Sequence, residues 1–556
     1  MKRVLTNWKN IAIIALSVAC IGLSSGIGYY FYKVGTFGIR EDIGGYAQVV
    51  SEPVSDKVPY EKNIIERYSF PDLERMDTEG QETLIQPLQV MQKIDVLGLD
   101  TETFKNPENG MFATANRLDD VLREYIDNSN REKVEYRGTS GSELQKIINS
   151  NVGKDIYLLT DVVDECGTID IPSNTHIYAN QTKFIGDGNI LFKLDHADNV
   201  VLDGFVLDGG YEDAVYAVES TNVVVRNATI SGLQSKALVF IAGQNLFIQN
   251  NEMVENLEGG IHITGFANDI LIEGNTIEEC HGTWNYTAGI VLSGLYPSDV
   301  WHLWTGSKKS LIEDGYAPHN AIIRNNVIKN NYANGIYSDG AFLCYYTDNQ
   351  IMDNDKEGLC LDCGSLGNYV AENSFIRNGR RNYQADQDLA KDYVLSVGRM
   401  EDGSSTSKIP GVSLDNGAYN IIKANLISNN YGGGIKCVRA CVRNLIMENT
   451  LIDNNIGENE KFHFFGIELG TAVADEKDKH AKVIDYAPSF ENIVARNTIS
   501  GNHYAGVFIS TDGYCNDIFD NIIMDCGWFS VEAISAKFNS IVNNFSNVDM
   551  RNEYQQ

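Results

Sequence analysis

Three aspartates occupy matching positions in a strand pattern that the sequence repeats, a glycine followed by alternating apolar residues. They are Asp339, Asp362 and Asp415. Alternate side chains of a strand point to opposite faces, so the pattern predicts one outward row of carboxylates on successive strands. Strands in a sheet lie about 4.8 Å apart. Carboxyl pairs about 5 to 5.5 Å apart serve retaining glycoside hydrolases and pairs about 6.5 to 9.5 Å apart serve inverting ones, so both outcomes stay open.

A lysine completes the candidate catalytic group. Lys436 follows on the next repeat, in the outward position beside the carboxylate row. Like charges in one row raise the pKa of one member, which keeps a carboxyl protonated as a general acid near neutral pH. We therefore predict Asp339, Asp362, Asp415 and Lys436 as catalytic residues. The oxygen-rich row also suits a Ca²⁺ ion, and no other cofactor is predicted.

Further outward and loop residues are predicted to bind the substrate. Aromatic faces stack on the apolar faces of sugar rings, and three tryptophans fall within residues 284–304; the alternative is that they only pack their loop onto the fold. The predicted substrate-binding residues are Tyr337, Arg439, Glu468, His262, Trp284, Trp301 and Trp304. Cys360 and Cys363 lack a second pair or a histidine at metal-ligand spacing, which predicts a disulfide or two free thiols rather than a zinc site.

The strands that must position these residues come from a repeat of 24 residues. Its leading asparagine recurs in steps of 24, 51, 23, 24, 52, 24, 48 and 24 residues, so three turns carry insertions. These asparagines are Asn251, Asn275, Asn326, Asn349, Asn373, Asn425, Asn449, Asn497 and Asn521. One such repeat cannot bury its own apolar side, so the repeats must stack, and each strand pairs with those above and below.

The repeat predicts an all-β fold, a right-handed parallel β-helix solenoid. A second asparagine column five residues further on predicts an internal ladder of side-chain amides along the axis. Its members are Asn256, Asn331, Asn354, Asn378, Asn430, Asn454 and Asn502. Cys280 and Cys526 take places in this column, which predicts buried free thiols. The insertions are predicted to wall a groove over the strands of Asp339, Asp362, Asp415 and Lys436.

Residues 142–547 resemble the pectate-lyase-type right-handed β-helix superfamily, which includes polygalacturonase-like hydrolases, polysaccharide lyases and mannuronan epimerases. The resemblance rests on the repeat and on the opening segments Ser142-Glu-Leu-Gln-Lys-Ile-Ile, Ile171-Pro-Ser-Asn-Thr and Val201-Leu-Asp-Gly-Phe-Val-Leu-Asp-Gly. It implies a polysaccharide substrate, and it indicates the fold more strongly than the reaction because this fold hosts several reactions.

The family's catalytic motifs are matched in part. Tyr337-Ser338-Asp339-Gly340 stands where polygalacturonase-like enzymes have Asn-Thr-Asp, and Gly434-Ile435-Lys436 resembles their Arg-Ile-Lys without the arginine. Asp362 stands alone where they have two aspartates, and Ser413-Leu414-Asp415 replaces their Gly-His-Gly. The Asp-Pro-His motif of the epimerases is absent.

Three functions follow as hypotheses. The first is a glycoside hydrolase in which the aspartates divide the acid and base roles and Lys436 binds a sugar carboxylate or hydroxyl. The second is a polysaccharide lyase or C5-epimerase in which Lys436 removes the C5 proton of a uronate while Arg439 or a metal neutralises its carboxylate. The third is a non-catalytic β-helix that binds glycan or serves as an envelope scaffold.

The net charge of −31 excludes nucleic acid as a partner and favours a neutral or sparsely charged glycan.

The predicted organisation is a cytoplasmic tip (1–10), a transmembrane anchor (11–32), a stalk with a short helix at 116–127 (33–139) and the β-helix (140–547). Residues 11–32 carry no charge, span a bilayer core in length and follow Lys2, Arg3 and Lys9, which places the C-terminal part outside a cell membrane in single-pass topology. A cleaved signal peptide is the alternative. Ser140 and Glu143 predict a capping box that opens a helix closing the solenoid.

Overall fold

The protein is described by a computed structural model, and all described residues belong to one compact unit, residues 49–556. The structure describes residues 106–127, 130–282, 285–294, 317–362, 364–380, 409–438, 441–456, 465–470, 489–502, 504–510, 513–534, 536 and 538–553.

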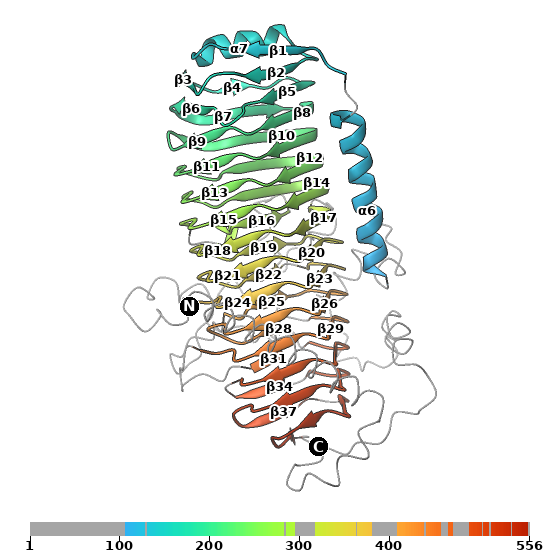
Figure 1. The fold of residues 1–556 in the computed structure, drawn as a ribbon. Helices are drawn as coiled ribbons and strands as arrows, with labels where there is room; N and C mark the ends of the chain where they lie inside the picture. Colours follow the sequence, from blue (N-terminus) through green and yellow to red (C-terminus); the bar gives the residue numbers. More distant parts are fainter. Residues whose placement is uncertain are drawn as a thin grey trace, which may run out of the picture. The chain divides into compact units, whose positions relative to one another are not determined.

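Short parallel strands stack turn upon turn into a solenoid (Figure 1). In the described part of the chain, 14 of them form one sheet with one strand from each turn, so the predicted all-β parallel solenoid is confirmed. The strands of this sheet are β3 (Val162–Cys166), β6 (Lys183–Gly186), β9 (Val206–Asp208), β11 (Thr229–Ser231), β13 (Glu252–Val254), β15 (Thr276–Glu278), β18 (Val327–Lys329), β21 (Gln350–Met352), β24 (Ser374–Ile376), β27 (Leu426–Ser428), β30 (Thr450–Ile452), β33 (Thr498–Ser500), β36 (Ile522–Met524) and β39 (Phe545–Ser546).

The other described strands form a larger sheet that runs as two rows. Three long strands pass through both rows: β10 (Tyr211–Arg226), β12 (Leu238–Gln249) and β14 (Ile261–Glu273). The first row contains β4 (Ile169–Asp170), β7 (Gly188–Asp195), β16 (Ile290–Ser293), β19 (Ile336–Asp339), β22 (Leu359–Asp362), β25 (Val412–Asp415), β28 (Ile435–Val438), β31 (Phe465–Leu469), β34 (Ala505–Ile509), β37 (Phe529–Ile534) and β40 (Arg551–Glu553). The second row contains β1 (Lys133–Tyr136), β2 (Asp155–Leu158), β5 (Thr175–Tyr178), β8 (Asp198–Asp203), β17 (His319–Arg324), β20 (Tyr345–Thr347), β23 (Tyr369–Ala371), β26 (Ile421–Lys423), β29 (Leu445–Met447), β32 (Ile493–Ala495), β35 (Asp517–Phe519) and β38 (Ser540–Val542).

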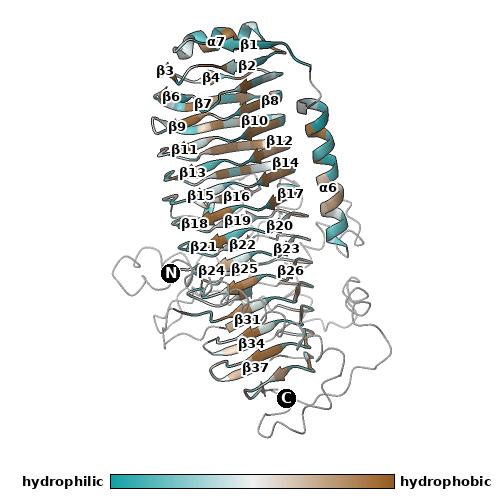
Figure 2. Cartoon of the chain, in the orientation of Figure 1, coloured by the Kyte–Doolittle hydropathy of each residue, from teal (hydrophilic) through white to brown (hydrophobic). Residues whose placement is uncertain are grey.

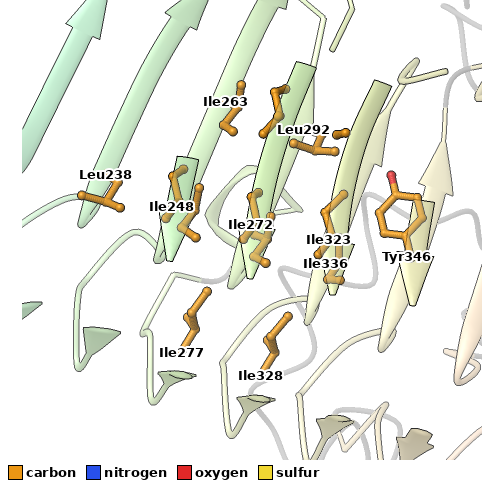
Figure 3. Close-up of a cluster of buried hydrophobic side chains, with 14 of the residues drawn as sticks. Leu238, Ile248, Ile263, Ile272, Ile277, Leu292, Ile323, Ile328, Ile336 and Tyr346 are labelled. Carbon is orange, nitrogen blue, oxygen red and sulfur yellow. The ribbon is translucent and has the colours of Figure 1, made fainter. Parts of the chain in front are cut away.

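The core lies inside the solenoid, enclosed by these two rows and the 14-stranded sheet, and alternate residues along the strands supply its apolar side chains. Figure 3 shows Ile263, Leu292 and Ile336 from the first row and Ile277 and Ile328 from the 14-stranded sheet, all members of one buried hydrophobic cluster. All five are buried. The strands are correspondingly hydrophobic in Figure 2, and the corners between them are polar. Since inward positions are filled by this packing, the alternate first-row positions must face outward.

Buried asparagines form ladders along the axis, as predicted for the column from Asn331 to Asn454. In that column, the Asn331 side-chain nitrogen donates to the Asn354 oxygen at 2.9 Å, and the pattern continues to Asn454. Cys280 and Cys526 are free thiols and buried, as expected.

The leading asparagines of the repeat form a second ladder that the sequence analysis did not predict. They occupy the sharp corner between the second row and the 14-stranded sheet, where a residue of left-handed backbone conformation precedes each one, as Ala424 (φ 54°) precedes Asn425. A third ladder runs from Asn368 to Asn539.

Two helices pack against the solenoid. α7 (Gly141–Ser150) buries Leu144 and Ile148 on the core, as expected for a helix that closes its end. The predicted capping box was wrong in one respect: Ser140 is the N-cap, but its side chain makes no capping hydrogen bond. Its hydroxyl instead lies 3.0 Å from that of Ser142.

α6 (Pro107–Leu122) starts nine residues before the predicted helix and ends in a π-helical turn (Arg123–Asp127). It lies along the second row (Figure 1). Leu118 is buried among second-row residues such as Val201 and Phe247. The Tyr369 hydroxyl donates to Glu108 at 2.9 Å. The helix therefore leaves the first row uncovered.

Across the described ranges, no helix combines the length and apolar character needed to cross a membrane. The predicted anchor, residues 11–32, lies outside the described residues.

Candidate functional site

The predicted carboxylate row exists in the strand register. Asp339 pairs with Asp362, and Leu361 pairs with Leu414, which places Asp415 beside Asp362 on the next strand. These strands, β19, β22 and β25, are neighbours in the middle of the solenoid (Figure 1). Strand spacing sets adjacent backbones about 4.8 Å apart. The geometry that the repeat predicted is thus confirmed, while the catalytic role of the three residues stays a prediction.

The neighbouring outward column also has the predicted order. Tyr337 pairs with Cys360, Cys360 with Ser413, and Ser413 with Lys436. Lys436 in turn pairs with Glu468. Two small side chains, Cys360 and Ser413, therefore separate the large side chains of Tyr337 and Lys436 along this column.

Two tyrosines hold the aspartates in different ways. The Tyr286 hydroxyl donates to Asp339 at 2.5 Å, and the Tyr337 hydroxyl donates to Asp362 at 2.8 Å. The two rings meet edge to face with centroids 5.1 Å apart. Asp339 is only 5% exposed, whereas Asp362 and Asp415 are half-buried. Asp362 and Asp415 are consequently the two members of the row that solvent and substrate reach more easily.

Glu357 is a site residue that the sequence analysis missed. It lies just before Gly358 and β22, and the Asn334 side-chain nitrogen donates to its carboxylate at 2.8 Å. Burial raises the pKa of Glu357, and the positive charges of Lys356 and Lys436 oppose that rise. The repeat pattern could have identified Glu357. Only outward positions after the glycine of each repeat were considered as site residues, although the residue before that glycine also reaches the outer face.

Three carboxylates lie near enough to the Cys360 thiol to raise its pKa. Burial raises the pKa of Cys360 well above its ordinary value, and Glu357, Asp362 and Asp415 raise it further. Glu357 precedes Cys360 in the chain and Asp362 follows it, so acidic groups stand on both sides of Cys360 along the strand direction. The thiol stays protonated under these conditions and is a poor nucleophile.

A second lysine adjoins the site from the turn before β22. Lys356 is 4% exposed, and its amino group donates to the Asn285 side-chain oxygen at 2.6 Å. Its positive charge lowers the pKa values of both Glu357 and Cys360. Lys356 therefore offsets part of the negative charge of the cluster.

His262 lies two strands before Asp339, on β14, and does not join the carboxylate row. Burial and the charge of Lys236 lower the pKa of its imidazole to about 4, against the opposing effect of Glu258. A ring nitrogen of His262 lies 3.3 Å from the Ser293 hydroxyl. The side chain is therefore a neutral imidazole at neutral pH, apart from the cluster of acidic groups.

The remaining predicted site residues lie outside the described residues: Arg439, Trp284, Trp301 and Trp304. The same is true of most of the insertions predicted to wall a groove, residues 295–316, 381–408, 457–464 and 471–488. Among the side chains that are described, no three His, Cys, Asp or Glu residues are grouped so as to hold a metal ion.

Fold and site together define a class, a parallel β-solenoid that carries acidic residues on an outer row of strands. Three overlapping matches to the family model "right handed beta helix region" cover residues 125–277, 191–375 and 318–476. They extend over 352 of the 556 residues, from 125 to 476. The chain belongs to this right-handed beta helix family, and the predicted handedness is confirmed.

Solved structures with a similar fold include three proteins. The A-module of the Azotobacter vinelandii mannuronan C-5 epimerase AlgE4 is 14% identical, with 74% of this chain and 97% of that chain covered and a TM-score of 0.46. The periplasmic alginate epimerase AlgG is 12% identical, with 77% and 88% covered and a TM-score of 0.41. The catalytic unit of the GH87 α-1,3-glucanase from Streptomyces thermodiastaticus is 11% identical, with 77% and 69% covered and a TM-score of 0.46. No curated protein sequence matches the chain.

Proposed function

We propose that the protein is a carbohydrate-active enzyme that hydrolyses a polysaccharide over Cys360 and Ser413. The observation that carries the proposal is the placement of acidic groups around these two small side chains. Asp362 and Asp415 follow them on adjacent strands, Glu357 precedes Cys360, and Lys436 stands on the next strand. A sugar ring resting on the two small residues meets acidic groups from both directions.

The environments of the carboxyl groups divide their roles. Glu357 has a raised pKa and is the general acid that gives its proton to the glycosidic oxygen as the carbon–oxygen bond breaks. Asp362 or Asp415 is the partner carboxylate, which either takes a proton from the attacking water or attacks the sugar itself. Lys436 holds a sugar oxygen. Asp339, the most buried of the three aspartates, supports the row through Tyr286.

The test is turnover of a polysaccharide panel by the full-length protein. The panel contains neutral glucans and xylans, amino-sugar polymers and uronate polymers, and new reducing ends are measured together with the ultraviolet absorbance of unsaturated uronates. Reducing ends without that absorbance support hydrolysis. Both signals together indicate a lyase, and neither signal with no proton exchange at C5 of uronates indicates a binding role.

Site variants then locate the reaction. Asp362→Asn or Asp415→Asn, whichever removes the partner carboxylate, should lower kcat by about 10²- to 10⁴-fold, the usual contribution of an acid–base group. Asp161→Asn is the matched control, because Asp161 is exposed in an early turn of the solenoid. Full activity in both Asp362→Asn and Asp415→Asn would place the reaction elsewhere on the molecule.

The proposal extends to location. Residues 11–32 anchor the chain in a cell membrane in single-pass topology and leave the solenoid outside, where a polysaccharide is accessible. Full-length protein should stay in the membrane pellet after alkaline carbonate extraction, while a chain that starts at residue 40 is released. Release of both forms contradicts the anchor.

A further inference from the structure

Five aromatic side chains lie close together on three successive turns of the first row, those of β31, β34 and β37. The rings of Phe465 and Phe508 stack with centroids 4.2 Å apart and planes 6° apart. Tyr504 meets Phe465 edge to face and stacks on Trp528 at 5.4 Å. Phe529 meets Tyr504 edge to face at 6.1 Å. We call these five residues the aromatic platform.

The platform continues the outer face that carries the candidate site. Phe508 pairs with Glu468, and Glu468 pairs with Lys436, so Phe508 lies two strands beyond Lys436. Two strand spacings are roughly 10 Å. Tyr504 and Trp528 lie just before β34 and β37, in the turn that corresponds to that of Lys356 and Glu357 before β22. The paired strands of the first row are therefore continuous from the acidic row to the aromatic platform.

Packing explains part of the platform but not its outermost ring. Phe465 is buried, and Tyr504, Phe508 and Phe529 are half-buried, as stacked rings on a sheet would be. Trp528 is 63% exposed, and no member of the platform belongs to the hydrophobic core of the solenoid. A single exposed aromatic residue is ordinary, but a contiguous group with an open tryptophan at its edge indicates a binding surface.

The charged residues beside the aromatic platform indicate whether its ligand is neutral or anionic. Glu468 and Glu532 lie on the same outward column as Phe508. The Glu532 carboxylate accepts hydrogen bonds from Arg551 at 3.2 Å and from the Tyr504 hydroxyl at 3.4 Å. Because Arg551 neutralises the buried Glu532, the half-buried Glu468 is the carboxylate that disfavours a uronate chain beside the rings. An uncharged pyranose offers its apolar C–H face to an aromatic ring at no electrostatic cost.

From this geometry we propose that the aromatic platform binds a neutral polysaccharide chain, holding the part of the substrate that extends from the acidic row toward the C-terminal turns. The inference rests on the proposed function for its substrate class. Trp528 contributes the accessible stacking face, and Tyr504 orients it. Substrates that are too short to pass Glu468 do not reach the platform.

Direct binding tests the platform without requiring turnover. Isothermal titration of the full-length protein with the neutral polysaccharides of the panel should show that Trp528→Ala weakens binding about tenfold, the loss expected for one stacked aromatic ring. Trp528→Tyr should retain most of the affinity. Phe538→Ala is the control, because Phe538 is a 78% exposed aromatic residue outside the platform and its loss should leave affinity unchanged.

Footprinting of the wild-type protein covers the case in which a variant does not fold. Oxidation of Trp528 by hydroxyl radicals should slow when a neutral polysaccharide binds, as measured by mass spectrometry. On the polymer, Trp528→Ala should raise KM with kcat unchanged, and on short oligosaccharides it should change neither.

The outcomes separate the two proposals. Binding that depends on Trp528 without cleavage refutes hydrolysis and keeps the platform, and cleavage with equal affinity in Trp528→Ala and wild type refutes the platform. Absence of binding to every neutral polysaccharide, or tighter Trp528-dependent binding to a uronate polymer, also overturns the inference.

Discussion

At the scale of single residues, the candidate site depends on how differently its carboxyl groups are surrounded. Asp339 is buried under the Tyr286 hydroxyl, Asp362 accepts a hydrogen bond from Tyr337, and Glu357 is half-buried and accepts a hydrogen bond from Asn334. Residue types and spacing predicted the row of aspartates because a two-residue alternation fixes which side chains face outward. They did not predict Glu357, because the position before the repeat's glycine was not counted and because its raised pKa depends on desolvation in the folded chain.

Glu357→Gln tests the general acid through the pH profile. A general acid must be protonated, so kcat/KM of the wild type should fall as pH rises through the pKa of Glu357, which burial holds above its ordinary value. Glu357→Gln should lower activity about 10²- to 10⁴-fold and abolish that alkaline limb. Glu143→Gln, an exposed change on α7, should leave the whole profile intact.

The same substitution has a predictable effect on stability. Because the folded state holds the Glu357 proton more tightly than the unfolded chain does, the contribution is present below the unfolded pKa and is lost as pH rises through the folded pKa. Urea unfolding should therefore show Glu357→Gln gaining stability relative to wild type as pH increases over that range. A pH-independent difference between the two proteins would mean that the carboxyl is not perturbed.

At the scale of elements, the asparagine ladders determine where each strand ends and the next begins. Sequence spacing alone located the corners, since a period of 24 residues survives three insertions. The leading asparagines at the second-row corners recur with the same separations of 23 to 52 residues as the predicted ladder, but they were used only to measure the repeat. The length of α6 was also underestimated. Its N-terminal half is stabilised by contacts with the second row, including the hydrogen bond from Tyr369 to Glu108, and local periodicity does not reveal such contacts.

Asn425→Ala tests a ladder position. The Asn425 side-chain nitrogen donates to the Val370 carbonyl and to the Asn449 side chain, and its oxygen accepts from the backbone and side chain of Asn373. Removal breaks four buried hydrogen bonds, each worth about 1 kcal/mol, and leaves the Asn373 backbone N–H without its partner. The Asn373 side chain keeps the Tyr346 carbonyl, and the Asn449 oxygen keeps the Asn425 backbone N–H. We expect a loss of at least about 3 kcal/mol in the free energy of unfolding, measured by urea denaturation.

Gln350→Ala is the matched control for this change, because Gln350 carries the same amide group on an exposed position of β21. Its effect should stay within about 0.5 kcal/mol. Equal effects of the two substitutions would show that the ladder adds nothing beyond strand pairing.

At the scale of the whole molecule, stacking turns concentrates acidic residues from distant parts of the sequence on one face, within a chain whose net charge is −31. Such a field repels polyanions at distances up to the Debye length, about 8 Å at physiological salt.

If the proposed site and platform act on neutral chains, kcat/KM for a neutral polysaccharide should change less than about twofold between low and high salt, since no charge is screened. Binding of a uronate polymer should instead start weak and strengthen several-fold as salt rises. Titrations at several NaCl concentrations measure both trends. Weakening of uronate binding with salt would mean that cationic groups near the site, Lys356 and Lys436 among those described, outweigh the acidic surroundings, and the substrate would then be an anionic glycan.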